Sequence, residues 1–233
     1  MRSWPGRHCD RFTLTCQHVK SYRTITHSSS GLYREKGSKF LAYATPIADR
    51  EAFAEFAAGL RKEHPKARHH CFAYRLGYDG EDYRASDDGE PSGTAGKPIL
   101  GRMISLDLTY VAIIVVRYFG GKLLGAAGLV RAYKLAAEDA LAAATIKEIP
   151  ITVDYTIACD YGHVGKLEEA MARNNIFIKS RSFAGTPIFT VGLPLGAEKA
   201  MINLILSQTL NLPSEQIGDE TEWDGLVIRP TSP

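Results

Sequence analysis

One short segment of the sequence constrains the fold more than any other. Residues 110–117 read YVAIIVVR, and the six positions from Val111 to Val116 are all apolar. Valine and isoleucine predominate, and the run has the length of a strand rather than of a helix. Because no polar residue alternates with the apolar ones, both faces of this strand are expected to be covered.

The length and composition of the chain are those of a globular protein. A chain of 233 residues buries roughly 70% of its unfolded surface, so it needs no disulfide or metal to hold its core together. Its 45% hydrophobic and 23% charged residues exclude a disordered, collagen-like or coiled-coil chain. The formal net charge of +2 is too small to indicate a nucleic-acid partner by bulk electrostatics. The longest apolar run is far shorter than the roughly 18 residues of a membrane span, so no membrane partner is expected.

The cysteines and the N-terminus indicate a cytoplasmic protein. Cys9, Cys16, Cys71 and Cys159 lie far apart without C-x-x-C spacing, which argues against a disulfide framework or a zinc ribbon. The first residues contain no apolar stretch that would mark a secretory signal. We therefore expect a reducing, cytoplasmic location.

Apolar periodicity places further elements around the central strand. The expected elements are strands within 19–25 and 39–47, a helix from the N-cap Asp49 to about His64, a hairpin that turns at Asp79-Gly80, a short helix after Pro98, and a glycine-rich turn at 120–128 followed by a helix to about Ala144.

A second unit is expected after Pro150, where the apolar pattern restarts. The net charge changes there from +6 over residues 1–150 to −4 over residues 151–233. The second unit has the order βαββαβ, which is the ferredoxin-like arrangement. We therefore predict a two-domain α+β protein, with a poorly ordered extension at 1–18, domains at 19–148 and 151–233, and a short linker at 147–150.

The glycine-rich turn is a candidate anion-binding site. A strand, a turn and a helix start follow one another, which presents backbone N–H groups and the positive end of a helix to a ligand. Neither a Walker loop nor G-x-G-x-x-G is present, because Val116 and Leu123 stand where the first glycines belong. The helix dipole disfavours a cation in the first turn by a few tenths of a kcal/mol, and Arg131 is expected there. The candidate residues are Arg117, Gly120, Gly121, Lys122, Gly125, Gly128 and Arg131.

Two explanations fit the cations of this turn. Lys122 and Arg131 bind an anionic ligand such as phosphate, an RNA backbone or an acidic protein surface. Alternatively, Arg131 pairs internally with a carboxylate of the acidic loop, namely that of Asp87, Asp88 or Glu90.

The acidic loop at 86–98 (SDDGEPSGTAGKP) is the second candidate site, since loops of this length are usually functional or mobile. Its candidate residues are Ser86, Asp87, Asp88, Gly89, Glu90, Ser92 and Lys97. Ser86 or Ser92 with His69 or His70 would make a nucleophile and base, and Asp87, Asp88 and Glu90 would hold magnesium. Neither pattern has a specific spacing, and a solvated loop is the commoner outcome.

Metal-ligating residues do not cluster with a recognised spacing. His69, His70 and Cys71 are neighbours on a predicted strand and point to opposite faces, so at most two share one ion. His8, Cys9, Cys16 and His18 lack zinc-finger spacing. We therefore predict no metal, no cofactor and no catalytic residue.

Four segments resemble one protein family: KGSKF at 36–40, HHCFAY at 69–74, SDDGEPSGTAGKPIL at 86–100 and VVRYFGGKLLGAAGLVRAY at 115–133. They are similar to the YigZ/IMPACT family over about residues 22–146, with one departure at Ala127, where the family typically has glycine. Residues 151–233 resemble the extra C-terminal domain of the bacterial members.

The resemblance implies both a fold and a function. It implies an N-terminal βα sandwich similar to the second domain of ribosomal protein S-five and a C-terminal domain similar to domain V of elongation factor G. Eukaryotic members of the family are translational regulators that bind the activator of an initiation-factor kinase, a partner not expected in a bacterium. The family brings no catalytic residues.

Two functional hypotheses follow. The first is a translation-associated binding protein that holds the ribosome, RNA or a translation-related protein through its basic glycine-rich turn. The second is an uncharacterised, hydrolase-like enzyme with the acidic loop as its site.

Overall fold

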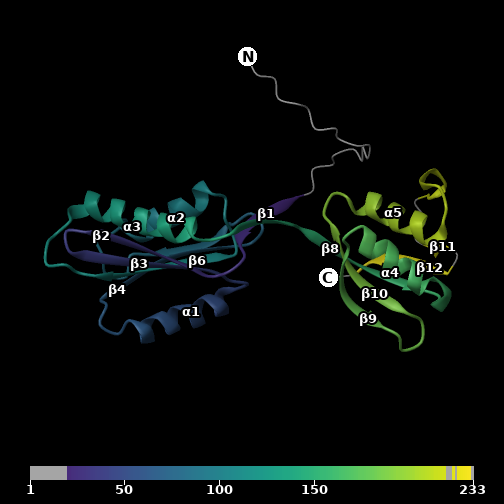
Figure 1. The fold of residues 1–233 in the computed structure, drawn as a ribbon, viewed down its shortest axis with the longest axis horizontal. Coiled ribbons are helices and arrows are strands. Elements are labelled where there is room, and N and C mark those ends of the chain that lie inside the picture. The colour runs from purple at the N-terminus through teal and green to yellow at the C-terminus, as the bar shows by residue number, and fades with distance from the viewer. Residues whose placement is uncertain (1–19, 219–221, 224, 232–233) are drawn as a thin grey trace, which may run out of the picture. The chain divides into compact units, whose positions relative to one another are not determined.

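The computed structural model describes residues 20–218, 222–223 and 225–231. The chain divides into two compact units, Ser21–Ile149 and Pro150–Pro233, the second counted together with Lys20. Each unit is built on its own five-stranded sheet (Figure 1). The predicted α+β fold class is thereby confirmed, whereas the extension predicted at 1–18 lies outside the described residues.

The first unit is a sheet with helices on both faces. Five strands are hydrogen-bonded in the order β2-β3-β6-β4-β5, with antiparallel neighbours throughout, and β1 pairs with β7. Helices α2 and α3 cover one face of the sheet, and α1 covers the opposite face (Figure 1). The elements are β1 (Ser21–Ile25), β2 (Ser29–Glu35), β3 (Ser38–Pro46), α1 (Arg50–Glu63), β4 (His69–Leu76), β5 (Asp82–Ser86), α2 (Gly96–Ser105), β6 (Val111–Tyr118), α3 (Gly125–Ala142) and β7 (Ile146–Pro150).

The apolar run of the sequence is the central strand β6. All six residues from Val111 to Val116 are at most 1% exposed. Ile113 and Val115 join the core beneath α2 and α3, whereas Ile114 and Val116 pack on the side of α1. The expectation that both faces of this strand are covered is confirmed.

The ends of α1 follow the local sequence. The carboxylate of Asp49 accepts a hydrogen bond from the backbone N–H of Ala52 at 2.8 Å and caps the first turn, as predicted. At the other end His64 lies between two tyrosines, with its ring nitrogens 2.8 Å from the hydroxyl of Tyr43 and 3.0 Å from that of Tyr118. These bonds tie the end of α1 to β3 and β6.

Three local expectations for this unit are wrong. Strand β2 was not expected, because its SSGLYRE sequence has little apolar alternation. Residues 147–150, expected as a linker, belong to strand β7. Helix α2 begins at Gly96 rather than after Pro98. Pro98 is tolerated in the first turn because the first N–H groups of a helix have no intrahelical partner.

The second unit has the predicted βαββαβ order. Its sheet has the strand order β11-β12-β8-β10-β9, and its core includes Ile157, Leu167, Phe189 and Ile205. No helix among the described residues is long and apolar enough to cross a membrane. The elements are β8 (Thr152–Cys159), the 3-10 turn η1 (Tyr161–His163), α4 (Val164–Arg173), β9 (Phe177–Ser182), β10 (Ile188–Pro194), α5 (Glu198–Leu210), η2 (Ser214–Gln216), β11 (Glu222–Trp223) and β12 (Leu226–Pro230).

His70 makes the stability of the first unit depend on pH. The side chain is 5% exposed, and neither ring nitrogen has a hydrogen-bond partner within the described structure. Burial, followed by the nearby charge of Arg61, lowers the pKa of His70 below the ordinary value of 6.5. Below pH 6.5 the unfolded chain therefore binds more protons than the folded chain, so His70 reduces stability as the pH falls.

We expect His70→Leu to remove this part of the pH dependence. Urea unfolding at pH 7.5 and at pH 5.5 measures the free energy of unfolding of the variant and of the wild type. The variant should gain stability relative to the wild type on acidification. An equal difference at both pH values would show that His70 titrates alike in the folded and unfolded chains.

Candidate functional site

Asp87 of the acidic loop holds the start of helix α2. Its carboxylate accepts backbone hydrogen bonds from Gly93 at 2.8 Å and from Ala95 and Gly96 at 2.9 Å each. Burial alone raises the pKa of Asp87, but these N–H donors and the nearby Lys97 bring it below its ordinary value. Since α2 has no side-chain cap of its own at Ala95, the Asp87 carboxylate takes the place of one.

Asp88 ties the loop to the start of β4. Its carboxylate accepts the N–H of His70 at 2.7 Å and a guanidinium hydrogen bond from Arg61 at 3.1 Å. Its carbonyl oxygen lies 2.9 Å from Nδ1 of His69. The backbone turns here with φ +39° at Asp88 and +86° at Gly89, the second of which glycine adopts without strain.

Glu90 lies in a buried polar cluster with Arg117, Tyr133 and Cys71. Its Oε1 atom accepts hydrogen bonds from the guanidinium of Arg117 at 2.6 Å and from the hydroxyl of Tyr133 at 2.8 Å. The side chains of Arg117 and Glu90 are only 7% and 3% exposed. Burial raises the pKa of the Cys71 thiol, 3.3 Å from that hydroxyl, to about 12, so the thiol stays protonated.

The acidic loop thus directs its three carboxylates inward. Among the described residues no three His, Cys, Asp or Glu side chains are placed to hold a metal ion. The serines form no nucleophile–base pair, because the Ser86 hydroxyl accepts from the N–H of Asp88 and His70 has no ring partner in the described structure. Ser92 is exposed. The loop contacts connect β4, α2 and β6.

Arg131 is placed differently from the prediction. It is the seventh residue of α3, not a member of the first turn, and it pairs with Glu35 of β2 rather than with Asp87, Asp88 or Glu90. The internal-pairing explanation is correct in kind, but the partner was wrong, since Glu35 lies 96 residues away along the chain. The carboxylate of Glu90 pairs with Arg117 instead.

The glycines of the predicted site have separate roles. Gly120 packs against the β2–β3 turn so closely that a Cβ atom would lie 1.9 Å from the carbonyl carbon of Gly37. Gly121 and Gly125 have positive φ angles of +84° and +71°. Gly128 lies within α3 and not in the turn. Ala127, also inside α3, has no positive φ, so alanine fits where the family typically has glycine.

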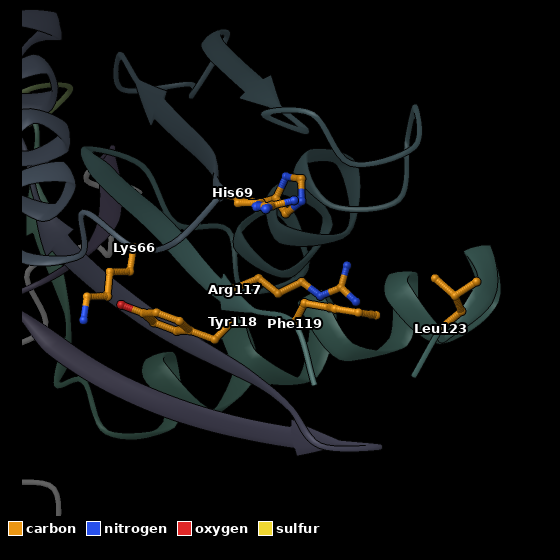
Figure 2. Close-up of a pocket in the computed structure, with 7 residues that line it drawn as sticks. Lys66, His69, Arg117, Tyr118, Phe119 and Leu123 are labelled. Atoms are coloured by element: carbon orange, nitrogen blue, oxygen red, sulfur yellow. The ribbon is translucent and has the colours of Figure 1, made fainter. Parts of the chain in front are cut away.

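A hollow opens beside the glycine-rich turn, at the end of β6. It has a volume of about 530 Å³ and is lined by Lys66, Arg68, His69, Arg117, Tyr118, Phe119 and Leu123. Figure 2 shows the guanidinium of Arg117 beside the ring of Phe119, with Lys66 near Tyr118. A second hollow of about 390 Å³ shares Tyr118 and Phe119 and adds Leu32, Arg34, Gly37, Lys39 and Leu41. We call the two together the basic groove.

Four cations of the basic groove have no carboxylate partner. The side chains of Arg34, Lys39, Lys66 and Arg68 form no ion pair or hydrogen bond within the described part of the chain, and no Asp or Glu lines either hollow. Lys122 of the predicted site is exposed beside the groove, next in sequence to Leu123. The prediction that the turn binds an anion remains a prediction, and the structure places these further cations near it.

The sequence indicated Arg117 as a binding residue and His69 as a possible base, but it did not indicate Arg34, Lys39, Lys66, Arg68, Tyr118 or Phe119 as site residues. Lys66 and Arg68 follow the end of α1, where Pro65 indicated only a helix stop. Tyr118 and Phe119 stand between the apolar strand and the glycines. The basic run KAR at 66–68 and the aromatic pair were the available signals, but only the sheet brings them together.

Comparisons with known proteins agree with the resemblance seen in the sequence. A family model described as the Impact N-terminal domain matches residues 36–141. "IMPACT family member YigZ" of Escherichia coli (strain K12) is 35% identical over 161 residues, which cover 68% of this chain and 79% of that protein. The chain belongs to the IMPACT family.

Solved structures extend the similarity of this IMPACT family member to the fold. A crystal structure of a hypothetical protein aligns with a TM-score of 0.61 at 30% identity, over 81% of this chain and 92% of that one. The two-domain translational regulator Yih1 aligns with a TM-score of only 0.32 at 23% identity, over 60% of this chain and 55% of that one. So low a score lends no support to a shared binding mode.

We expect Asp87→Ala to lower the free energy of unfolding by about 1–3 kcal/mol, because it leaves buried N–H groups without an acceptor. Ser92→Ala, an exposed change in the same loop, should stay within about 0.5 kcal/mol. Urea unfolding measures both variants. Because the folded-state pKa of Asp87 lies below 3.8, the difference from wild type should shrink as the pH falls through that folded-state value. A difference unchanged at acidic pH would contradict the assigned role of the carboxylate.

The buried pair allows a sharper stability test. Glu90→Ala leaves the Arg117 charge buried without its partner and should cost about 3–5 kcal/mol in urea unfolding. The double variant Glu90→Ala with Arg117→Met should recover part of that loss. Glu35→Ala breaks a pair whose Arg131 side chain is 62% exposed, so it should cost clearly less than Glu90→Ala. Equal effects of Glu90→Ala and Glu35→Ala would contradict this ranking of the pairs.

Proposed function

We propose that this IMPACT family member is a translation-associated binding protein that holds an anionic partner in the basic groove. The observation that carries the proposal is the charge of the groove. Arg34, Lys39, Lys66 and Arg68 line two adjoining hollows without a carboxylate to neutralise them. Like charges gathered this way raise the local concentration of an anionic ligand.

The carboxylates of the acidic loop do not line the groove, because they are bonded elsewhere in the protein. Asp87, Asp88 and Glu90 point to backbone N–H groups, to Arg61 and into the buried cluster. The connection to translation comes from the family resemblance. The candidate partners are therefore the ribosome, RNA or a translation-related protein with an acidic surface.

A hydrolase-like enzyme with the acidic loop as its site is the alternative. The hydrogen bonds of Asp87 and Glu90 would first have to break before these carboxylates acted on a substrate. A saturable activity that is lost on changing Asp87 or Ser92 in a folded protein would favour this alternative.

Salt-dependent binding tests the proposal. The double variant Lys66→Glu with Arg68→Glu should weaken binding to ribosomes or RNA and flatten its dependence on salt concentration. Each lost phosphate contact to a single strand removes about 0.7 from the log–log slope. Fluorescence anisotropy at several salt concentrations gives both quantities for RNA, and sedimentation measures ribosome binding.

The matched control is Lys134→Glu with Lys166→Glu, which changes the net charge equally at two exposed lysines outside the groove. The control should bind nearly as well as the wild type. If both double variants lost the same amount of binding affinity, the net charge of the protein would explain the loss, and the proposed role of the groove would be contradicted.

A further inference from the structure

The exposed aromatic ring of Phe119 is a feature of the basic groove that a simple anion does not need. Phe119 follows β6 directly and is 57% exposed. The guanidinium of Arg117 lies 5.6 Å from the centroid of its ring, which is a cation–π contact (Figure 2). With one side of the ring against Arg117 and more than half of the residue exposed, the face turned away from Arg117 is open to a ligand.

Arg117 is a rigid support for this ring. Its guanidinium also lies 5.4 Å from the ring centroid of Phe40, and Glu90 holds it at 2.6 Å inside the protein. Glu90 is held in turn by Tyr133 of α3. The support is thus fixed by β3, the acidic loop and α3 before any ligand arrives.

The backbone next to Phe119 is also fixed. Gly120 lies against Gly37, where no Cβ atom would fit, and its N–H donates to the hydroxyl of Ser38 at 3.1 Å. A ring held on both its side-chain and its backbone side loses little conformational freedom on binding. Phe119 is therefore a preorganised, flat and exposed surface.

Cations lie on both sides of this surface. Phe119 and Tyr118 line both hollows of the groove, with Lys66 and Arg68 in one hollow and Arg34 and Lys39 in the other. A ligand that satisfies the groove must therefore carry negative charges at intervals and present a flat group between them. Single-stranded nucleic acid has both properties, since its phosphates repeat along the chain and its bases stack on aromatic rings.

We propose that the basic groove binds single-stranded nucleic acid, with one unpaired base stacked on Phe119 and the flanking phosphates held by Lys66, Arg68, Arg34 and Lys39. The proposal rests on the proposed function, because it names the class of anionic partner at the same groove. A duplex keeps its bases stacked on one another, so it reaches the cations but not the ring.

Another part of the turn distinguishes this ligand from an acidic protein. Leu123 lines one hollow and is 84% exposed, whereas Phe119 lines both hollows and is 57% exposed. A protein partner would be expected to bury a projecting apolar side chain such as Leu123 in its interface. Nucleic acid that stacks a base on Phe119 would depend on Phe119 more than on Leu123.

The experiment compares variants of Phe119 in the full chain. Fluorescence anisotropy is measured with an oligoadenylate RNA of about 12 nucleotides, which matches the site sizes of single-strand binders, with DNA of the same sequence and with a paired RNA duplex. Inorganic polyphosphate serves as a competitor without bases. Phe119→Ala and Phe119→Leu should each weaken single-strand binding about tenfold or more, the range that one stacked base supplies.

The controls distinguish a requirement for an aromatic ring from a requirement for any large apolar side chain. Phe119→Tyr keeps the ring and should bind within about twofold of the wild type. Phe177→Ala, which removes a phenylalanine of the second unit that is 69% exposed, should have no effect. Leu123→Ala changes a lining residue of one hollow and should weaken binding clearly less than Phe119→Leu does. Phe119→Leu keeps apolar bulk in case Phe119→Ala fails to fold, which thermal unfolding checks. In Phe119→Trp the added indole fluorescence should be quenched by the oligonucleotide but not by polyphosphate.

The outcomes distinguish the stacking proposal from the proposed function. Single-strand binding unchanged in Phe119→Leu, but lost in Lys66→Glu with Arg68→Glu, would overturn base stacking and leave anion binding intact. Duplex binding as tight as single-strand binding, or a loss in Leu123→Ala equal to that in Phe119→Leu, would also overturn it. If Lys66→Glu with Arg68→Glu left the affinity for RNA, DNA and polyphosphate unchanged, both proposals would be contradicted.

Discussion

The buried ion pair between Arg117 and Glu90 is the interaction on which the rest of the first unit depends. Burying two charges costs several kcal/mol each, and only good geometry with additional hydrogen bonds offsets that cost. Here the two side chains meet at 2.6 Å, and Tyr133 donates a further hydrogen bond to the same carboxylate oxygen. The pair therefore holds β6, the acidic loop and α3 in one fixed arrangement.

One consequence of this arrangement is a separation of charge. The carboxylates of Asp87, Asp88 and Glu90 bond to backbone N–H groups, to Arg61 and to the buried Arg117, so they form no ion pair with Lys66 or Arg68. These two side chains form no ion pair with any described residue. The formal net charge of the whole chain is only +2, so it gave no indication of this local excess of positive charge.

The sequence predicted what depends on local pattern, and it missed what depends on pairing between distant residues. The central strand and the Asp49 cap each follow from a few consecutive residues, and both are confirmed. The βαββαβ order follows from the periodic pattern within each successive element, and it is confirmed as well. The pair between Arg131 and Glu35 and the contact of Gly120 with Gly37 depend on where β2 and β3 lie in the sheet. Strand β2 had no clear alternation, so neither contact was predictable.

The segments that carry the family resemblance contact one another in the structure. KGSKF meets the glycine-rich turn through Gly37 and Gly120, and HHCFAY meets the acidic loop through the N–H of His70 and the carboxylate of Asp88. The acidic loop meets the segment at 115–133 through Glu90 and Arg117. These motifs therefore build a common support at one end of the sheet. Lys39, Arg117 and Phe119 of the basic groove lie inside these motifs, whereas Lys66 and Arg68 stand outside all four, so the common support positions only part of the groove.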